Sequence, residues 1–145
     1  MPLDVTHQLL TTKARVAKIA AIGSKPAQAM VEWLQFFERF DENKYGTDGG
    51  PLHDPTVIAY VLQPVLFSGR KVYVAVEQNS ELTLGATPVD WWGVTGKAAN
   101  VNYLTTVDSD GFFRLLADNL STLPFSILTK NGLPCWCCSI QLPVW

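Results

Sequence analysis

The chain contains 145 residues, carries a net charge of -2, and is 48% hydrophobic but only 17% charged. This length is enough for one domain with a moderate core, and the lack of excess lysine and arginine argues against a nucleic-acid partner. No stretch reaches the length of a membrane span, and Met1–Asp4 lacks the charged start and apolar run of a signal peptide. We therefore expect a cytoplasmic protein with no nucleic acid and no membrane as partner.

The first half of the chain is predicted to be mainly helical. Residues 2–6 are apolar and β-branched, which favours the end of a strand. Residues 11–22 and 25–43 each repeat apolar side chains at three- and four-residue steps, which is typical of helices with one buried face. Glycine and proline then indicate a loop over residues 45–51, and a short helix is predicted over residues 54–62.

The second half changes to the two-residue period of strands. Residues 71–77 alternate apolar and polar side chains, residues 81–89 are predicted to form a partner strand, and residues 101–107 alternate again. Asp108 or Ser109 is then expected to cap a last helix.

The last residues differ from the rest of the chain. From Pro124 onward there is no consistent period and no capping signal, and we assign this tail no role. Three cysteines, Cys135, Cys137 and Cys138, lie in the last eleven residues. Their odd number argues against a disulfide framework, and both histidines are too far away in sequence to suggest a zinc site.

The sharpest candidate for chemistry is the adjacent pair His53 and Asp54, at the start of the predicted helix. A carboxylate is a preferred ligand of calcium, and an imidazole transfers protons near neutral pH. The alternative is that Asp54 only caps the helix, with Pro55 in its first turn, although one carboxylate can serve both roles. Calcium takes about six to eight oxygens, and the sequence contains no Asp-x-Asp cluster. The pair therefore predicts half of an active site.

Three further positions have two interpretations each. Tyr45, ahead of the glycine loop, either reaches a ligand above the same pocket or is a partly buried loop aromatic. His7 either lies near the site or is structural or solvent-facing, and we favour the second. The pair Trp91–Trp92 either stacks on a base or covers the core at the end of a hairpin, and again we favour the second.

From about residue 2 to residue 123 the chain resembles the inosine-uridine preferring nucleoside hydrolases, because several short segments occur in the order seen in that family. The Pro-Leu-His-Asp-Pro motif is the most specific of them. The segments are Pro2-Leu3-Asp4-Val5-Thr6-His7-Gln8, Phe36-Phe37-Glu38-Arg39-Phe40, Gly49-Gly50-Pro51-Leu52-His53-Asp54-Pro55, and Glu81-Leu82-Thr83-Leu84-Gly85 with Val89-Asp90.

The resemblance implies a calcium-dependent enzyme that cleaves the N-glycosidic bond of purine or pyrimidine ribonucleosides, releasing base and ribose. It implies an α/β fold, of which this chain is the C-terminal part: an open, mixed sheet with helices flanking a few strands. The family's last metal-ligand aspartate falls on Asp54, and its base-side histidine, which can protonate the leaving group, falls on His53. Tyr45 matches a position where some members hold a tyrosine over the base.

The resemblance also implies parts that this sequence lacks. The aspartate-rich N-terminal motif, with most metal ligands and the catalytic base, has no counterpart here, and neither does the segment that binds the ribose. We therefore expect a domain portion over residues 1–123, with residues 124–145 outside it. Losing strands exposes a sheet edge and an apolar face, so we expect a homo-oligomer or a chain that needs the missing half. Two functions stay open: a nucleoside hydrolase, or a non-catalytic remnant that acts as a binding module.

Overall fold

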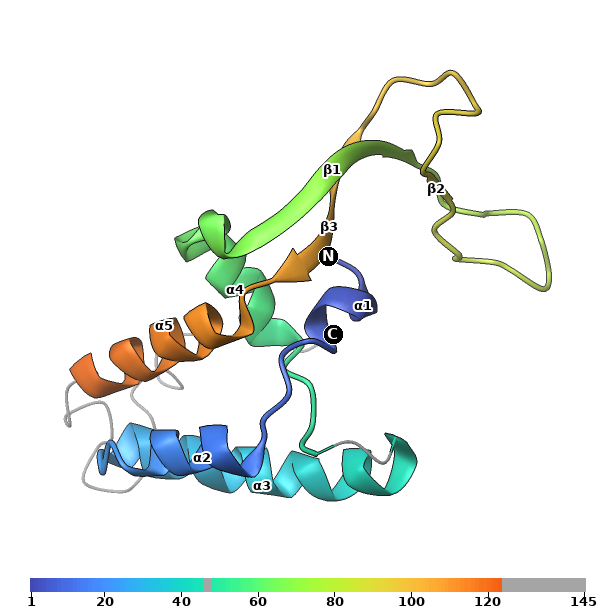
Figure 1. Cartoon of the computed structure of the whole chain (residues 1–145). Coiled ribbons are helices and arrows are strands. Elements are labelled where there is room, and N and C mark those ends of the chain that lie inside the picture. The colour runs from blue at the N-terminus through green and yellow to red at the C-terminus, as the bar shows by residue number, and fades with distance from the viewer. Residues whose placement is uncertain (46–47, 124–145) are drawn as a thin grey trace, which may run out of the picture. The chain divides into compact units, whose positions relative to one another are not determined.

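The computed structural model describes residues 1–45 and 48–123, without the side chains of residues 38–47. The chain divides into two compact units, one of residues 1–10 and 51–112, and one of residues 11–50 and from Phe113 onward. Figure 1 shows the elements in chain order by colour. Among the described residues, no helix is both long and apolar enough to cross a membrane.

The first unit combines a three-stranded sheet with short helices (Figure 1). The sheet has the order β2-β1-β3, and both strand pairs are antiparallel. The last helix, α5, begins in this unit and continues into the second. The elements are α1 (Leu3–Thr6), α4 (Asp54–Leu62), the 3-10 helix η1 (Pro64–Leu66), β1 (Phe67–Val74), β2 (Val89–Asp90), β3 (Val101–Val107) and α5 (Ser109–Thr122).

Gln8, just after α1, ties the start of the chain to β3. Its side-chain Nε2 donates to the carbonyl oxygen of Thr105 at 2.9 Å, and its Oε1 accepts from the backbone N–H of Val107 at 3.2 Å. The hydroxyl of Ser109 also donates to the Gln8 carbonyl oxygen at 2.8 Å. One polar side chain therefore fixes α1 against the edge of the sheet.

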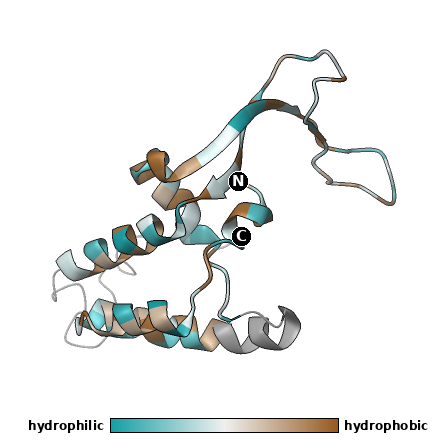
Figure 2. Ribbon diagram, viewed as in Figure 1, coloured by the Kyte–Doolittle hydropathy of each residue, from teal (hydrophilic) through white to brown (hydrophobic). Residues whose placement is uncertain are grey.

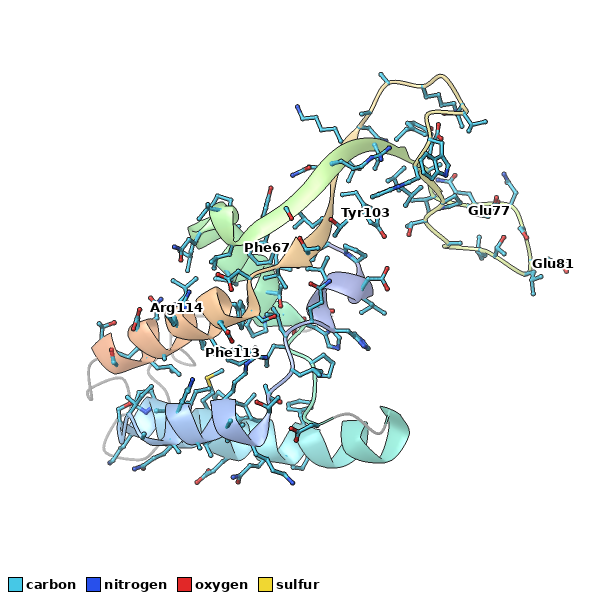
Figure 3. The ribbon with its side chains drawn as sticks, in the orientation of Figure 1. Phe67, Glu77, Glu81, Tyr103, Phe113 and Arg114 are labelled. Carbon is cyan, nitrogen blue, oxygen red and sulfur yellow. The ribbon has the colours of Figure 1, made fainter. Side chains whose placement is uncertain are left out.

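The core of the first unit lies between the sheet, α1, α4 and the start of α5. Phe67 at the start of β1 stacks edge-on against Tyr60 of α4, with ring centroids 5.5 Å apart (Figure 3 labels Phe67). The buried apolar side chains of this core are Val5, Leu9, Ala59, Phe67, Val72, Leu104 and Phe112. In this unit α1 near the start of the chain contacts β3, which lies about 100 residues later in the sequence.

The second unit contains α2 (Lys13–Ala20) and α3 (Lys25–Tyr45), which pack against each other. Thr12 caps α2 because its side chain accepts from the backbone N–H of Arg15 at 3.4 Å. The backbone N–H and the hydroxyl of Thr11 both donate to the Gly50 carbonyl oxygen at 2.9 Å. The predicted helices over residues 11–22 and 25–43 are thus confirmed, with α3 extending to Tyr45, which was expected in the following loop.

The predicted strand over residues 2–6 is wrong, because this segment forms the single helical turn α1. The hydroxyl of Thr6 donates to the carbonyl oxygen of Leu3 at 3.1 Å, which supports the turn from within. Val5 is completely buried. Burial of Val5 and the local hydrogen bond of Thr6 therefore favour a helical turn over the strand that the β-branched composition predicts.

The predicted strand over residues 81–89 is also largely wrong, since only Val89–Asp90 pairs with β1 and residues 81–85 form a turn. The carboxylate of Glu77 accepts from the backbone N–H groups of Asn79 and Ser80 at 2.7 and 3.1 Å, and these bonds turn the chain (Figure 3 labels Glu77). Gly85 has a φ of 83°, which a regular strand does not use.

The tryptophan pair does not act as one unit. Trp91 packs edge-on against Tyr103 of β3 at 5.8 Å between ring centroids, and the Arg70 guanidinium lies 4.3 Å from its ring centroid (Figure 3 labels Tyr103). Trp92 is 82% exposed. The expectation that the aromatic pair covers the core is therefore wrong for Trp92.

Candidate functional site

His53 stands immediately before α4, at its N-cap position. The helix begins here because Asp54 is followed by Pro55, whose fixed φ suits the first turn of a helix. The ring Nδ1 of His53 lies 2.8 Å from the Oγ1 of Thr6 in α1, and the residue is otherwise exposed. Within the described part of the chain, no hydrogen bond is found at its Nε2. Among the residues that the structure describes, the imidazole is therefore fixed at one nitrogen and open at the other.

Asp54 lies in the first turn of α4 and is exposed. It is not the cap, because His53 occupies that position and its side chain makes no capping bond. The alternative that Asp54 merely caps the helix therefore does not hold. A negative charge at this point is favoured by the positive end of the helix dipole. The carboxylate can therefore bind a cation or accept a hydrogen bond.

The described residues do not fit a calcium ion by themselves. They contain no group of three or more histidine, cysteine, aspartate and glutamate side chains that could hold a metal. Calcium takes about six to eight oxygen ligands, and Asp54 supplies at most two. The described part of the chain therefore offers one ligand and not a site.

Of the two remaining candidates, His7 lies beside the site, whereas the side chain of Tyr45 is outside the described residues. The ring of His7 lies 5.5 Å from that of His53, centroid to centroid, at an interplanar angle of 51°. His7 is thus both solvent-facing and a neighbour of the candidate site. Tyr45 is the last residue of α3, and its side chain lies outside the described residues, as do the tail and its three cysteines.

Sequence reasoning missed the role of Thr6. This residue contacts His53 across a separation of 47 positions, so no local pattern in the sequence predicts the pair. Thr6 and His7 did lie in one of the segments that carry the family resemblance. That shared segment was the only signal that α1 belongs beside the His53–Asp54 pair.

Two carboxylates with lowered pKa belong to loops of the sheet and not to this site. The hydroxyl and backbone N–H of Thr95, followed by the N–H of Val94, hold the pKa of Asp90 below its usual range. Backbone donors from Asn79 and Ser80 lower the pKa of Glu77 in the same way. These shifts reflect the hydrogen bonding of two turns.

Comparison with known proteins identifies the family. The profile of the inosine-uridine preferring nucleoside hydrolases matches residues 1–114. A protein of Schizosaccharomyces pombe is 47% identical over 124 residues, which cover 86% of this chain and 40% of that protein. A pyrimidine-specific ribonucleoside hydrolase, RihA, of Shewanella sp. strain ANA-3 is 43% identical over 130 residues, covering 89% of this chain and 41% of that enzyme. The chain therefore spans about 40% of the length of these relatives.

Solved structures agree on the fold. A purine-preferring ribonucleoside hydrolase from Gardnerella vaginalis matches 82% of this chain and 38% of its own, with a TM-score of 0.69 and 22% identity. A plant nucleoside hydrolase matches 85% of this chain and 41% of its own, also with a TM-score of 0.69 and 22% identity. These matches confirm the predicted partial α/β fold. The chain belongs to the inosine-uridine preferring nucleoside hydrolase family.

Proposed function

We propose that this chain forms the base-side part of the active site of a ribonucleoside hydrolase, which cleaves the N-glycosidic bond to release base and ribose. The observation that carries the proposal is the His53 ring, directly beside an exposed carboxylate. Its Nδ1 is held by Thr6, and its Nε2 has no hydrogen bond to any of the described residues. Membership of the family supports it, as does the similarity to enzymes named as pyrimidine-specific ribonucleoside hydrolases.

His53 acts in this proposal as the acid that protonates the departing base. Breaking an N-glycosidic bond leaves negative charge on the base nitrogen while the ribose gains oxocarbenium character. An imidazolium that donates its proton to that nitrogen lowers the activation barrier. Such general acid catalysis typically raises the rate by about 10²–10⁴-fold. His53 is exposed, so a substrate has access to its ring.

Asp54 is proposed to be one oxygen ligand of a calcium ion whose other ligands come from outside this chain. Tyr45 is proposed to lie over the base, by its match to the family position. The substrate class is a ribonucleoside. These assignments are proposed for a complete enzyme of this family, because the relatives are more than twice as long as this chain.

A chimera tests the proposal. The segment of the Shewanella RihA that aligns with this chain, 130 residues at 43% identity, is replaced by this chain's sequence. We expect the chimera to release base from a pyrimidine ribonucleoside. The His53→Ala variant should lose about 10²–10⁴-fold in kcat, and Asp54→Ala should lose calcium-dependent activity.

The matched control is Asp118→Ala, which removes another exposed aspartate, on α5. It should leave turnover unchanged. A folded chimera without turnover would contradict the proposal, as would His53→Ala or Asp54→Ala variants as active as the parent chimera.

A second candidate function, a non-catalytic binding module, is favoured by an exposed apolar surface on α4 and η1. Figure 2 shows hydrophobic residues concentrated in this segment. Such a surface is typical of a face that another protein covers. Its exposed side chains are Val57, Ile58, Val61, Leu62 and Val65.

Sedimentation of the purified chain tests whether a second copy of the chain covers this surface. Association through the surface predicts a dimer or larger species, and Val61→Glu should convert it to monomer. A monodisperse monomer at about 100 μM would contradict self-association, since an interface of ordinary affinity is occupied at that concentration.

A further inference from the structure

The hydrogen bonds around Thr6 determine which nitrogen of His53 carries a proton. The Thr6 hydroxyl has a single hydrogen, and it donates this hydrogen to the carbonyl oxygen of Leu3 at 3.1 Å. The Oγ1 then has only lone pairs left for a second partner. That partner is the Nδ1 of His53 at 2.8 Å, and Nδ1 is the donor when the hydroxyl hydrogen goes to Leu3. In this arrangement neutral His53 is protonated at Nδ1 and carries its lone pair on Nε2.

We propose that Thr6 is a positioning residue that orients the His53 ring and holds it in the Nδ1–H form. The hydrogen bond made by one ring nitrogen decides the state of the other. The nitrogen that is open in the described part of the chain is then Nε2. The catalytic meaning of this arrangement rests on the proposed function, whereas the tautomer itself does not.

Three features keep Thr6 itself in place. Its side chain is only 5% exposed, so water does not compete for its hydroxyl. The one-turn helix α1 supplies the acceptor at Leu3. Gln8 ties the following residues to β3 by two hydrogen bonds. The orienting group is thus attached to the sheet and not to a free loop.

The ring of His7 lies beside that of His53. The planes of the two imidazole rings make an angle of 51°, and the ring centroids are 5.5 Å apart. His7 directly follows Thr6 in the sequence. One short segment, Thr6–His7, therefore supplies both the hydrogen-bond acceptor and a packing surface for the ring.

The test is the ring ¹⁵N spectrum of the full chain, recorded in alkaline buffer in which the spectrum itself shows a neutral ring. We expect His53 to show a protonated Nδ1 and an unprotonated Nε2. Thr6→Val removes the hydroxyl at nearly constant volume and should shift His53 toward a mixture of both tautomers. Thr6→Ser keeps the hydroxyl and should restore the Nδ1–H form.

The matched control is Thr11→Val. Thr11 is 3% exposed and also donates its hydroxyl to a backbone carbonyl, but it lies in the second unit. Its substitution should leave the His53 spectrum unchanged. A wild-type ring protonated at Nε2 would overturn the proposal without any variant. A folded Thr6→Val protein with an unchanged tautomer would overturn it as well.

The same variants separate this inference from the proposed function. In the RihA chimera, Thr6→Val should lower kcat by about 10–100-fold at little change in KM, with recovery in Thr6→Ser. An inactive chimera with the expected spectrum would contradict the proposed function and leave the tautomer assignment intact. An active chimera with an Nε2-protonated ring would contradict the positioning role and leave the hydrolase function intact.

Discussion

Gly69 is the position at which a single added methyl group should separate the two long strands. It lies in β1 opposite Leu104, next to the register shift between Ser68 and Gly69. A Cβ built on Gly69 would overlap the carbonyl oxygen of Tyr103 and would lie 2.7 Å from the Cα of Leu104. Both atoms belong to the backbone of β3, so no side-chain rotation relieves the overlap.

The expected cost of Gly69→Ala follows from three effects. Overpacking costs about 1–3 kcal/mol, and more where backbone must move. Each ladder hydrogen bond lost adds about 0.5–1.5 kcal/mol. Against these, replacing glycine stabilises by about 0.4–1 kcal/mol through the unfolded chain. For one lost hydrogen bond these effects give a net loss of about 0.5–4 kcal/mol in the free energy of unfolding, and we expect the upper half of that range because backbone must move.

The assay is urea unfolding followed by circular dichroism, with Gly93→Ala as the control. Gly93 has open space around its Cβ position but a φ of +70°, so alanine there meets conformational strain without a clash. That strain is about 1–2 kcal/mol before the unfolded-state gain. If Gly69→Ala were within about 0.5 kcal/mol of wild type, the close approach of β1 and β3 would be refuted.

Three further outcomes are expected. Leu9→Ala should lower the free energy of unfolding by about 2–5 kcal/mol because Leu9 is 0% exposed. Leu82→Ala, at a position that is 93% exposed, should change it by no more than about 0.5 kcal/mol. Equal losses in the two variants by thermal unfolding would contradict the assignment of Leu9 to the core. The lowered pKa of Asp90 means that its ionised form adds stability above the unfolded pKa of about 3.9, and that this is lost as pH falls through the folded pKa. The modest difference in stability between wild type and Asp90→Asn should therefore shrink in acid, and a difference that grows toward low pH would disprove this. Calorimetric titration of the chain alone with about millimolar calcium should give no heat, because the described residues supply a single ligand; tight binding would contradict that conclusion.

Local signals were enough to predict several elements. The helix predicted over residues 54–62 is α4, and the strand predicted over residues 101–107 is β3, because both have a clear period and strong boundary residues. Asp108 caps α5 as expected, since its Oδ1 accepts from the backbone N–H of Gly111 at 3.0 Å. Caps and short-period patterns depend only on neighbouring residues, which a sequence displays directly.

The failures depend on contacts between distant residues or on side chains that turn the backbone. Residues 2–6 look like a strand by composition, yet the Thr6 hydroxyl and the burial of Val5 favour a helical turn. The hydroxyl oxygen of Ser80 accepts from the backbone N–H of Thr83 at 3.3 Å, and residues 81–85, which were expected in a strand, form a turn. The pair His53–Asp54 could be recognised because the two residues are adjacent in the sequence. Its hydrogen bond to Thr6, 47 positions away, is visible only in the three-dimensional structure. The domain boundary at residue 123 remains a prediction.

The most direct test of the central claim compares two leaving groups in the RihA chimera. Uracil is a poor leaving group that needs a proton, whereas 4-nitrophenolate departs from a riboside without one. If His53 is the leaving-group acid, His53→Ala lowers kcat on uridine by about 10²–10⁴-fold and on 4-nitrophenyl riboside by less than about tenfold. Equal losses on both substrates would contradict the role proposed for His53.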